Sequence, residues 1–125
     1  MSTERKLLEL AAKAAGMEVR RVDTEYEHCF KIPYSAPNVT GWEEWNPLTD
    51  DGDALRLAVK LHMDINFFYD GCDDQYDIVR VHTHGAECDA EEGLGFYIQG
   101  GQIDEDAATR RAIVRAAAAI GETMP

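Results

Sequence analysis

The residues best suited to chemistry in this sequence are His82, His84 and Cys88, which lie close together late in the chain. On a strand, side chains two residues apart point to the same face, so the two imidazoles would lie side by side. Imidazole nitrogen and thiolate sulfur are ligands that zinc commonly binds in proteins. The pattern therefore predicts a site for zinc or a similar ion, with His82, His84 and Cys88 as ligands and with Cys72, His28 or Asp70 as candidates for a fourth.

A purely structural interpretation of these histidines competes with the metal site. The chain holds 24 Asp and Glu residues against 12 Lys and Arg residues, so a histidine near a strand end has many carboxylates within reach. The His-x-His pattern is also short. Elemental analysis separates the two interpretations, because only a metal site would retain an ion in the purified protein.

Motifs of common enzyme classes are missing from the sequence. No glycine-rich phosphate loop precedes a helix, and no nucleophile elbow is present; the adjacent pair Gly100-Gly101 has the spacing of neither. Cys29 follows His28 directly, and neighbours on a strand point to opposite faces, which disfavours a thiol–imidazole pair there. The sequence thus favours a protein with no catalytic residues and no cofactor. The alternative is a metal-binding protein or metal-dependent hydrolase that uses His82, His84 and Cys88, with zinc as the ion.

The formal net charge of −12 indicates the kind of partner that the chain binds. Such a charge repels nucleic-acid backbones and anionic lipids. It attracts a basic protein surface. We therefore expect a protein partner that binds an acidic surface of this chain, and no direct binding of nucleic acid or membrane. The sequence does not decide between a monomer and a homo-oligomer.

Elements with clear periodicity surround these residues. Apolar residues at three- and four-residue steps predict a helix over Ser2–Ala15, closed by Gly16. Alternating residues predict strands up to Ile32, joined as a hairpin through Asp23-Thr24. The segment from Pro33 to Asp53 shows neither period, so we expect an irregular connection held down by Trp42 and Trp45.

The second half of the chain alternates helix, strands and helix. A helix is expected from Thr49 or Asp50, with a buried stripe of Leu55, Ala58, Val59 and His62 and with Leu57 and Leu61 beside it. Strands are expected at 65–69, 76–84 and 94–98, with an acidic loop at 87–92. A last helix runs from Asp104 or Asp106 to a closing Gly121, and its Arg111 and Arg115 are expected to reach carboxylates elsewhere in the fold.

This order of elements predicts one α+β domain over residues 1–125. We expect a three-layer α/β/α sandwich with a mostly antiparallel sheet and about three helices. The three cysteines are an odd number at irregular spacing and are expected to be free thiols. No apolar run approaches the length of a membrane span, and the first ten residues are charged, which favours a cytoplasmic protein.

Two stretches, WNPLTDDGDALRLAV at 45–59 and ATRRAIVRAA at 108–117, resemble the phage ABA sandwich domain. That family groups small uncharacterised proteins of tailed phages and prophages. The resemblance implies a layered domain with helices on both faces of the sheet, encoded by a phage or prophage and working in the cytoplasm of a bacterial host. It implies no reaction, so we expect a phage accessory protein that binds a host or phage protein, including a target in host defence.

Overall fold

The computed structural model describes residues 2–25, 28–33, 41–68, 78–83, 89–93 and 105–124. Within these residues lie three helices and six strands. The helices are α1 (Ser2–Ala15), α2 (Asp51–Lys60) and α3 (Glu105–Thr123). The strands are β1 (Arg20–Asp23), β2 (His28–Pro33), β3 (Trp42–Trp45), β4 (Met63–Phe68), β5 (Ile78–Thr83) and β6 (Ala90–Gly93).

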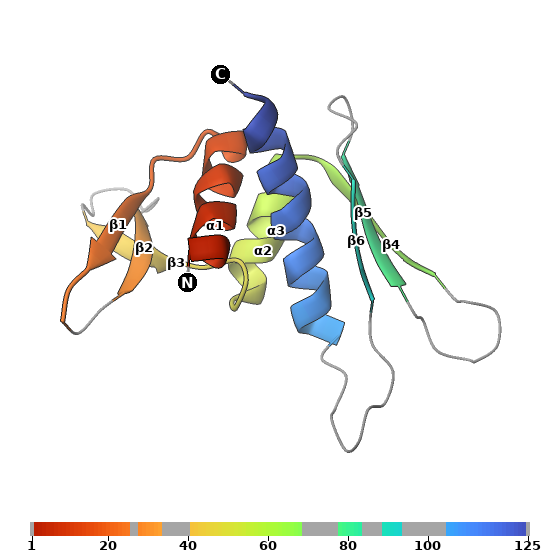
Figure 1. Cartoon of the computed structure of the whole chain (residues 1–125), viewed down its shortest axis with the longest axis horizontal. Coiled ribbons are helices and arrows are strands. Elements are labelled where there is room, and N and C mark those ends of the chain that lie inside the picture. Colours follow the sequence, from red (N-terminus) through yellow and green to blue (C-terminus); the bar gives the residue numbers. More distant parts are fainter. Residues whose placement is uncertain are drawn as a thin grey trace, which may run out of the picture.

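The strands form two antiparallel sheets with the helices between them (Figure 1). One sheet has the order β1-β2-β3 and the other the order β4-β5-β6. The α+β class, the three helices and the antiparallel pairing expected from the sequence are confirmed. The difference concerns the layers, because the strands make two small sheets instead of one and the helices occupy the centre.

The composition of α3 explains why this helix lies at the centre. Its residues 112–114 and 116–118 are all buried, and between them only Arg115 is exposed. A helix that is apolar on most sides must be covered on most sides. Helix α1 covers one side of α3, and the β4-β5-β6 sheet covers another (Figure 1).

Two glycines have different roles at the ends of α1 and α3. Gly16 has a φ of +67°, and the amides of Gly16 and Met17 donate to the carbonyls of Lys13 and Ala12, which ends α1 as predicted. Gly121 does not end α3, which continues to Thr123. A Cβ atom at Gly121 would lie 2.2 Å from the carbonyl oxygen of Leu10, so this glycine lets α1 and α3 approach closely.

Two predicted loops contain strands. Trp42–Trp45 forms β3, which pairs with β2, although the rest of the predicted connection at 34–40 lies outside the described residues. Strand β6 begins at Ala90, inside the predicted acidic loop, and pairs with β5. Both are short edge strands with two consecutive glutamates, so their sequences show no alternation. The predicted strand at 94–98 lies outside the described residues.

Helix α2 buries a different stripe from the one predicted. Asp53, Ala54, Leu57 and Ala58 are buried, whereas Leu55 is 61% exposed and Val59 is 64% exposed. His62 is exposed beyond the end of the helix. A single helix with apolar residues on two adjacent faces offers two stripes. The neighbouring α3 covers the one that contains Ala54 and Leu57.

The hydrophobic core joins all three layers. Trp45 and Phe30 pair across β3 and β2 and are buried, while Val79 and Val81 point inward from β5. Phe30, Trp45, Val79 and Val81 all belong to one hydrophobic cluster with residues of the helices. Trp45 therefore anchors its segment as predicted, while Trp42 remains partly exposed on the opposite face.

Candidate functional site

The turn between β3 and α2 is built by Asn46. Its side-chain oxygen accepts a hydrogen bond from the amide of Leu48 at 3.0 Å, and its carbonyl accepts from the amides of Thr49 and Asp50. Pro47, which follows, is buried and keeps Asn46 out of the helical region. These bonds hold the chain in a compact turn that leads directly into α2.

Two aspartates complete the start of α2. Asp50, one of the two predicted candidates, is the N-cap, and its Oδ2 accepts from the amide of Asp53 at 2.8 Å. Asp53 in turn reaches back, and its Oδ2 accepts from the amide of Asn46 at 2.9 Å. The side chain of Asp53 is only 9% exposed, so a buried carboxylate ties the helix to the turn before it.

Arg56 closes this arrangement from the next turn of the helix. Its Nη2 donates to Oδ1 of Asp53 at 2.7 Å and lies 4.0 Å from Oδ2 of Asp50. The hydrogen bond with Asp53 raises the pKa of Arg56, and the charges of Asp53, Asp50 and Glu43 add to that effect, while burial opposes it. The guanidinium thus stays charged within a group of carboxylates.

These residues border a hollow of about 370 Å³ beside β3. We call it the acidic hollow, and its charged lining consists of Glu43, Glu44, Asp50, Asp53 and Arg56. The lining thus contains four carboxylates and one guanidinium. Because Glu43, Glu44 and Asp50 are exposed, the hollow presents negative charge to solvent.

Helix α3 holds the acidic hollow in place from outside. Nε of Arg110 donates to the carbonyl of Leu48 at 2.9 Å, and its Nη1 pairs with Asp51. This arginine joins the first turn of α2 to the first turns of α3, so the hollow rests on two helices and a strand. Arg111 and Arg115 pair with Glu4 and Glu92, as the sequence predicts.

The predicted metal ligands are only partly within the described residues. His82 lies on β5 on the same face as Arg80, opposite the buried Val79, Val81 and Thr83, as the alternation predicts. Its Nδ1 lies 2.6 Å from Oδ1 of Asp89. His84 and Cys88 lie outside the described residues, as do Cys72 and Asp70.

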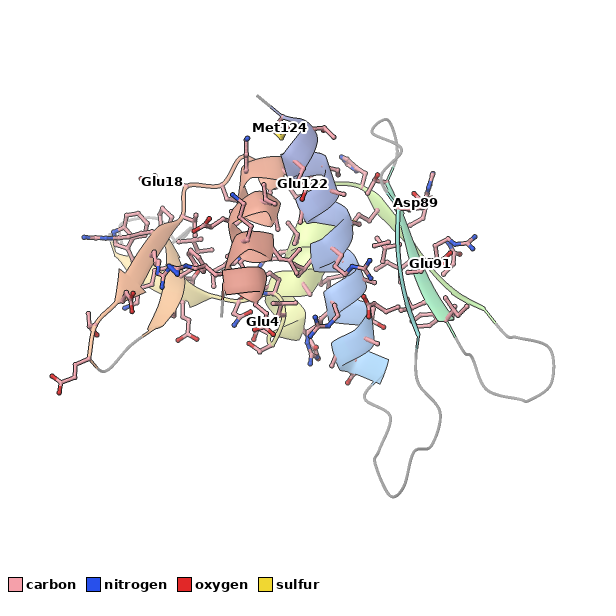
Figure 2. All side chains as sticks on the ribbon, viewed as in Figure 1. Glu4, Glu18, Asp89, Glu91, Glu122 and Met124 are labelled. Atoms are coloured by element: carbon pink, nitrogen blue, oxygen red, sulfur yellow. The ribbon has the colours of Figure 1, made fainter. Side chains whose placement is uncertain are left out.

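The face around His82 is polar and turned away from the helices. Figure 2 labels Asp89 and Glu91, which lie on the side of the sheet that faces away from α3. Arg80 pairs with Glu91 there at 2.5 Å. Across the described part of the chain, no three His, Cys, Asp or Glu side chains are grouped to hold a metal ion. The zinc site therefore stays a prediction.

Asp50 was one of two predicted caps, but the acidic hollow was not predicted from the sequence. Asp53 was not predicted to bridge back to Asn46, which its buried carboxylate does. The third helical position of α2 is where a side chain turns back toward the residues before the helix, and that spacing is the signal that was available. Glu43 and Glu44 were missed because their strand was not predicted.

No protein-family model matches the chain, and no curated protein or solved structure is significantly similar to it. The resemblance to the phage ABA sandwich domain therefore stays a prediction. None of the helices in the described ranges has the length and apolar character needed to cross a membrane.

Proposed function

We propose that this protein is a phage accessory protein, without enzymatic activity, that binds a basic host or phage protein through the acidic hollow. The observation that carries the proposal is the way the hollow holds Arg56. Asp50 and Asp53 hold a guanidinium that is itself 72% exposed, so the hollow accommodates a cation. A partner's arginine or lysine would meet the exposed Glu43 and Glu44 beside it.

The geometry of the hollow supports recognition of a protein side chain. Asp53 is fixed by the amide of Asn46, so its charge cannot turn away from the hollow. Glu43 and Glu44 are exposed on a short edge strand beside it. Carboxylates held on rigid elements lose little conformational entropy when they bind a cation. The net charge of −12 would also steer a basic partner toward the molecule.

Affinity capture from a bacterial host lysate tests this proposal with matched charge variants. Glu43→Gln with Glu44→Gln removes two charges from the hollow, and Glu9→Gln with Glu18→Gln removes two exposed charges elsewhere. We expect the wild-type protein and the second variant to capture the same partner, and the first variant to lose it. Raised salt should weaken the capture, since the contact is electrostatic.

Two results would count against binding through the hollow. Equal capture by both variants would place the contact elsewhere on the surface. Turnover of a substrate by the purified protein, with no partner captured at any salt concentration, would remove the binding function altogether.

A metal-binding protein or metal-dependent hydrolase is the second candidate, and the pair of His82 with Asp89 favours it. A carboxylate that accepts the Nδ1 proton of a histidine orients the ring for metal binding at Nε2. Zinc bound by His82, His84 and Cys88 would be detected by elemental analysis of the purified, untagged protein. We expect loss of the metal in a His82→Ala, His84→Ala double variant; a wild-type protein that stays metal-free after incubation with zinc excludes this function.

A further inference from the structure

A second hollow, on the outer face of the β1-β2-β3 sheet, has the opposite charge. It encloses about 500 Å³, and its walls carry Arg20, Arg21, Lys31, Asp23, Thr24 and Trp42. Three cationic side chains thus face one carboxylate in a protein whose net charge is −12. We call this the basic hollow, and it shares no lining residue with the acidic hollow.

The pairing of the strands brings the cations together. Arg20 on β1 lies opposite Lys31 on β2, so the two side chains share the outer face of the sheet. The inner face carries the buried Phe30 and Trp45. Because one face is fixed in the core, the other cannot slip in register, and the cations are held on a rigid surface.

Arg20 is placed to bind an anion because its guanidinium lies over an aromatic ring. The centre of the guanidinium is 5.4 Å from the centroid of Trp42. Stacking of this kind uses the flat face of the guanidinium and leaves its N–H groups at the edge for a planar or tetrahedral anion. In the described part of the chain, no carboxylate lies within ion-pair distance of Arg20.

Five arginines elsewhere in the structure are arranged differently. Each of them has a carboxylate partner, namely Asp53 for Arg56, Glu91 for Arg80, Asp51 for Arg110, Glu4 for Arg111 and Glu92 for Arg115. Arg20 differs from these five because its guanidinium lies over the ring of Trp42. Arg21, which lies opposite Phe30 and so belongs to the other face of the sheet, pairs with Asp23 at 3.1 Å at the border of the hollow.

We propose that the basic hollow binds a small molecule that carries a phosphate group with at least two negative charges. Guanidinium groups bind phosphate through paired N–H donors, and Lys31 adds a point charge. The volume is within the range of small-molecule sites. A long polyanion is disfavoured because the acidic surface around the hollow repels it.

Titration calorimetry of the full chain at low ionic strength tests this site, with pyrophosphate and a nucleoside diphosphate as probes. Arg20→Gln removes the stacked cation, and Lys60→Gln removes one exposed cation from the end of α2 as a matched control. We expect Arg20→Gln to raise the pyrophosphate Kd about tenfold or more, since a charge-assisted hydrogen bond is lost. Lys60→Gln should change it less than about twofold.

Further measurements separate a specific site from general attraction. Arg20→Lys keeps the charge but loses the planar group, and its Kd should lie between those of the wild type and Arg20→Gln. Fluorescence of Trp42 should change on binding. Because Trp45 also fluoresces, a Trp42→Phe variant shows which part of the signal comes from Trp42. A single-stranded oligonucleotide distinguishes a phosphate on nucleic acid from one on a small molecule.

Three outcomes would overturn the proposal. The first is no binding of pyrophosphate or of the nucleoside diphosphate. The second is equal weakening by Arg20→Gln and Lys60→Gln, which would show attraction to net charge alone. The third is binding of the oligonucleotide without binding of either small probe.

Discussion

Asp53 shows how much one buried side chain organises in this protein. Its two carboxylate oxygens serve different partners, the amide of Asn46 and the guanidinium of Arg56. The same residue therefore stabilises the turn before α2, the first turn of the helix and the charge arrangement of the acidic hollow. Loss of the carboxylate affects all three together.

We expect Asp53→Ala to lower the free energy of unfolding by about 2–3 kcal/mol, because a buried amide and a guanidinium lose their partners. Urea unfolding followed by circular dichroism measures this change. Glu9→Ala, at an exposed position of α1, is the control and should cost less than about 0.5 kcal/mol. Similar losses in the two variants would show that the bonds of Asp53 contribute nothing special.

The two leucines of α2 provide a second comparison at single residues. Leu57 is 2% exposed and Leu55 points to solvent. Truncation of Leu57 to Ala should cost about 2–5 kcal/mol because it leaves a cavity. Leu55→Ala should change the free energy of unfolding by no more than about 0.5 kcal/mol, as at other surface sites. A larger loss of stability in Leu55→Ala than in Leu57→Ala, measured by thermal or urea unfolding, would mean that α2 buries its other stripe.

Among the elements, the contact between α1 and α3 determines the arrangement of the core. Ala11 and Ala12 of α1 and the alanines of α3 are buried, so the two helices meet through small side chains. Close approach of the backbones at Gly121 and Leu10 follows from this composition. The sheets on either side are then packed against a narrow helical layer.

Gly121→Ala tests this close approach by the sign of its effect. An alanine in place of a helical glycine usually stabilises a helix by about 0.5–1 kcal/mol. At Gly121 the added Cβ would meet the backbone of Leu10, which cannot move aside, so we expect a loss of about 1–3 kcal/mol.

Gly52→Ala in α2 is the matched control for that substitution. The atoms nearest to its Cβ, at 3.2 Å, are the ends of the Arg56 and Asp50 side chains, which can shift. Its effect on the free energy of unfolding should stay within about 1 kcal/mol. A stabilising effect at Gly121 would show that α1 and α3 lie further apart than the structure has them.

At the scale of the whole molecule, charge is unevenly distributed. The acidic and basic hollows both border β3, one on Glu43 and Glu44 and the other on Trp42. Net charge predicts which long-range forces act on the protein, but each hollow acts on a ligand at short range. A strongly acidic protein can therefore contain a local site for an anion.

The net charge of −12 also predicts how salt affects stability. Repulsion among excess carboxylates disfavours the compact state, and salt screens it. We expect Tm to rise by about 4 °C between low and physiological salt, which corresponds to about 1 kcal/mol in a chain of this size. A Glu9→Lys, Glu18→Lys variant, with a formal charge of −8, should show a smaller rise. A Tm that falls with salt would show that the exposed ion pairs outweigh this repulsion.

The sequence by itself determined the elements whose signals are local. The first helix and its glycine cap and the hairpin that contains Phe30 were predicted correctly, and Asp50 was one of two predicted N-caps. Each depends on residues within a few positions, where periodicity and capping chemistry act directly. The same reasoning placed His82 on a strand, and the structure shows that its side chain lies opposite the buried Val79 and Val81.

Only the tertiary structure decided which surfaces meet. It divided the strands into two sheets, selected Leu57 over Leu55 as a core residue, and used Gly121 for close packing where the sequence suggested a helix end. It also brought Glu43, Asp53 and Arg56 into one hollow, and Arg20, Lys31 and Trp42 into another, from segments with no shared pattern. These outcomes depend on contacts between distant segments, whose free energy no local period records.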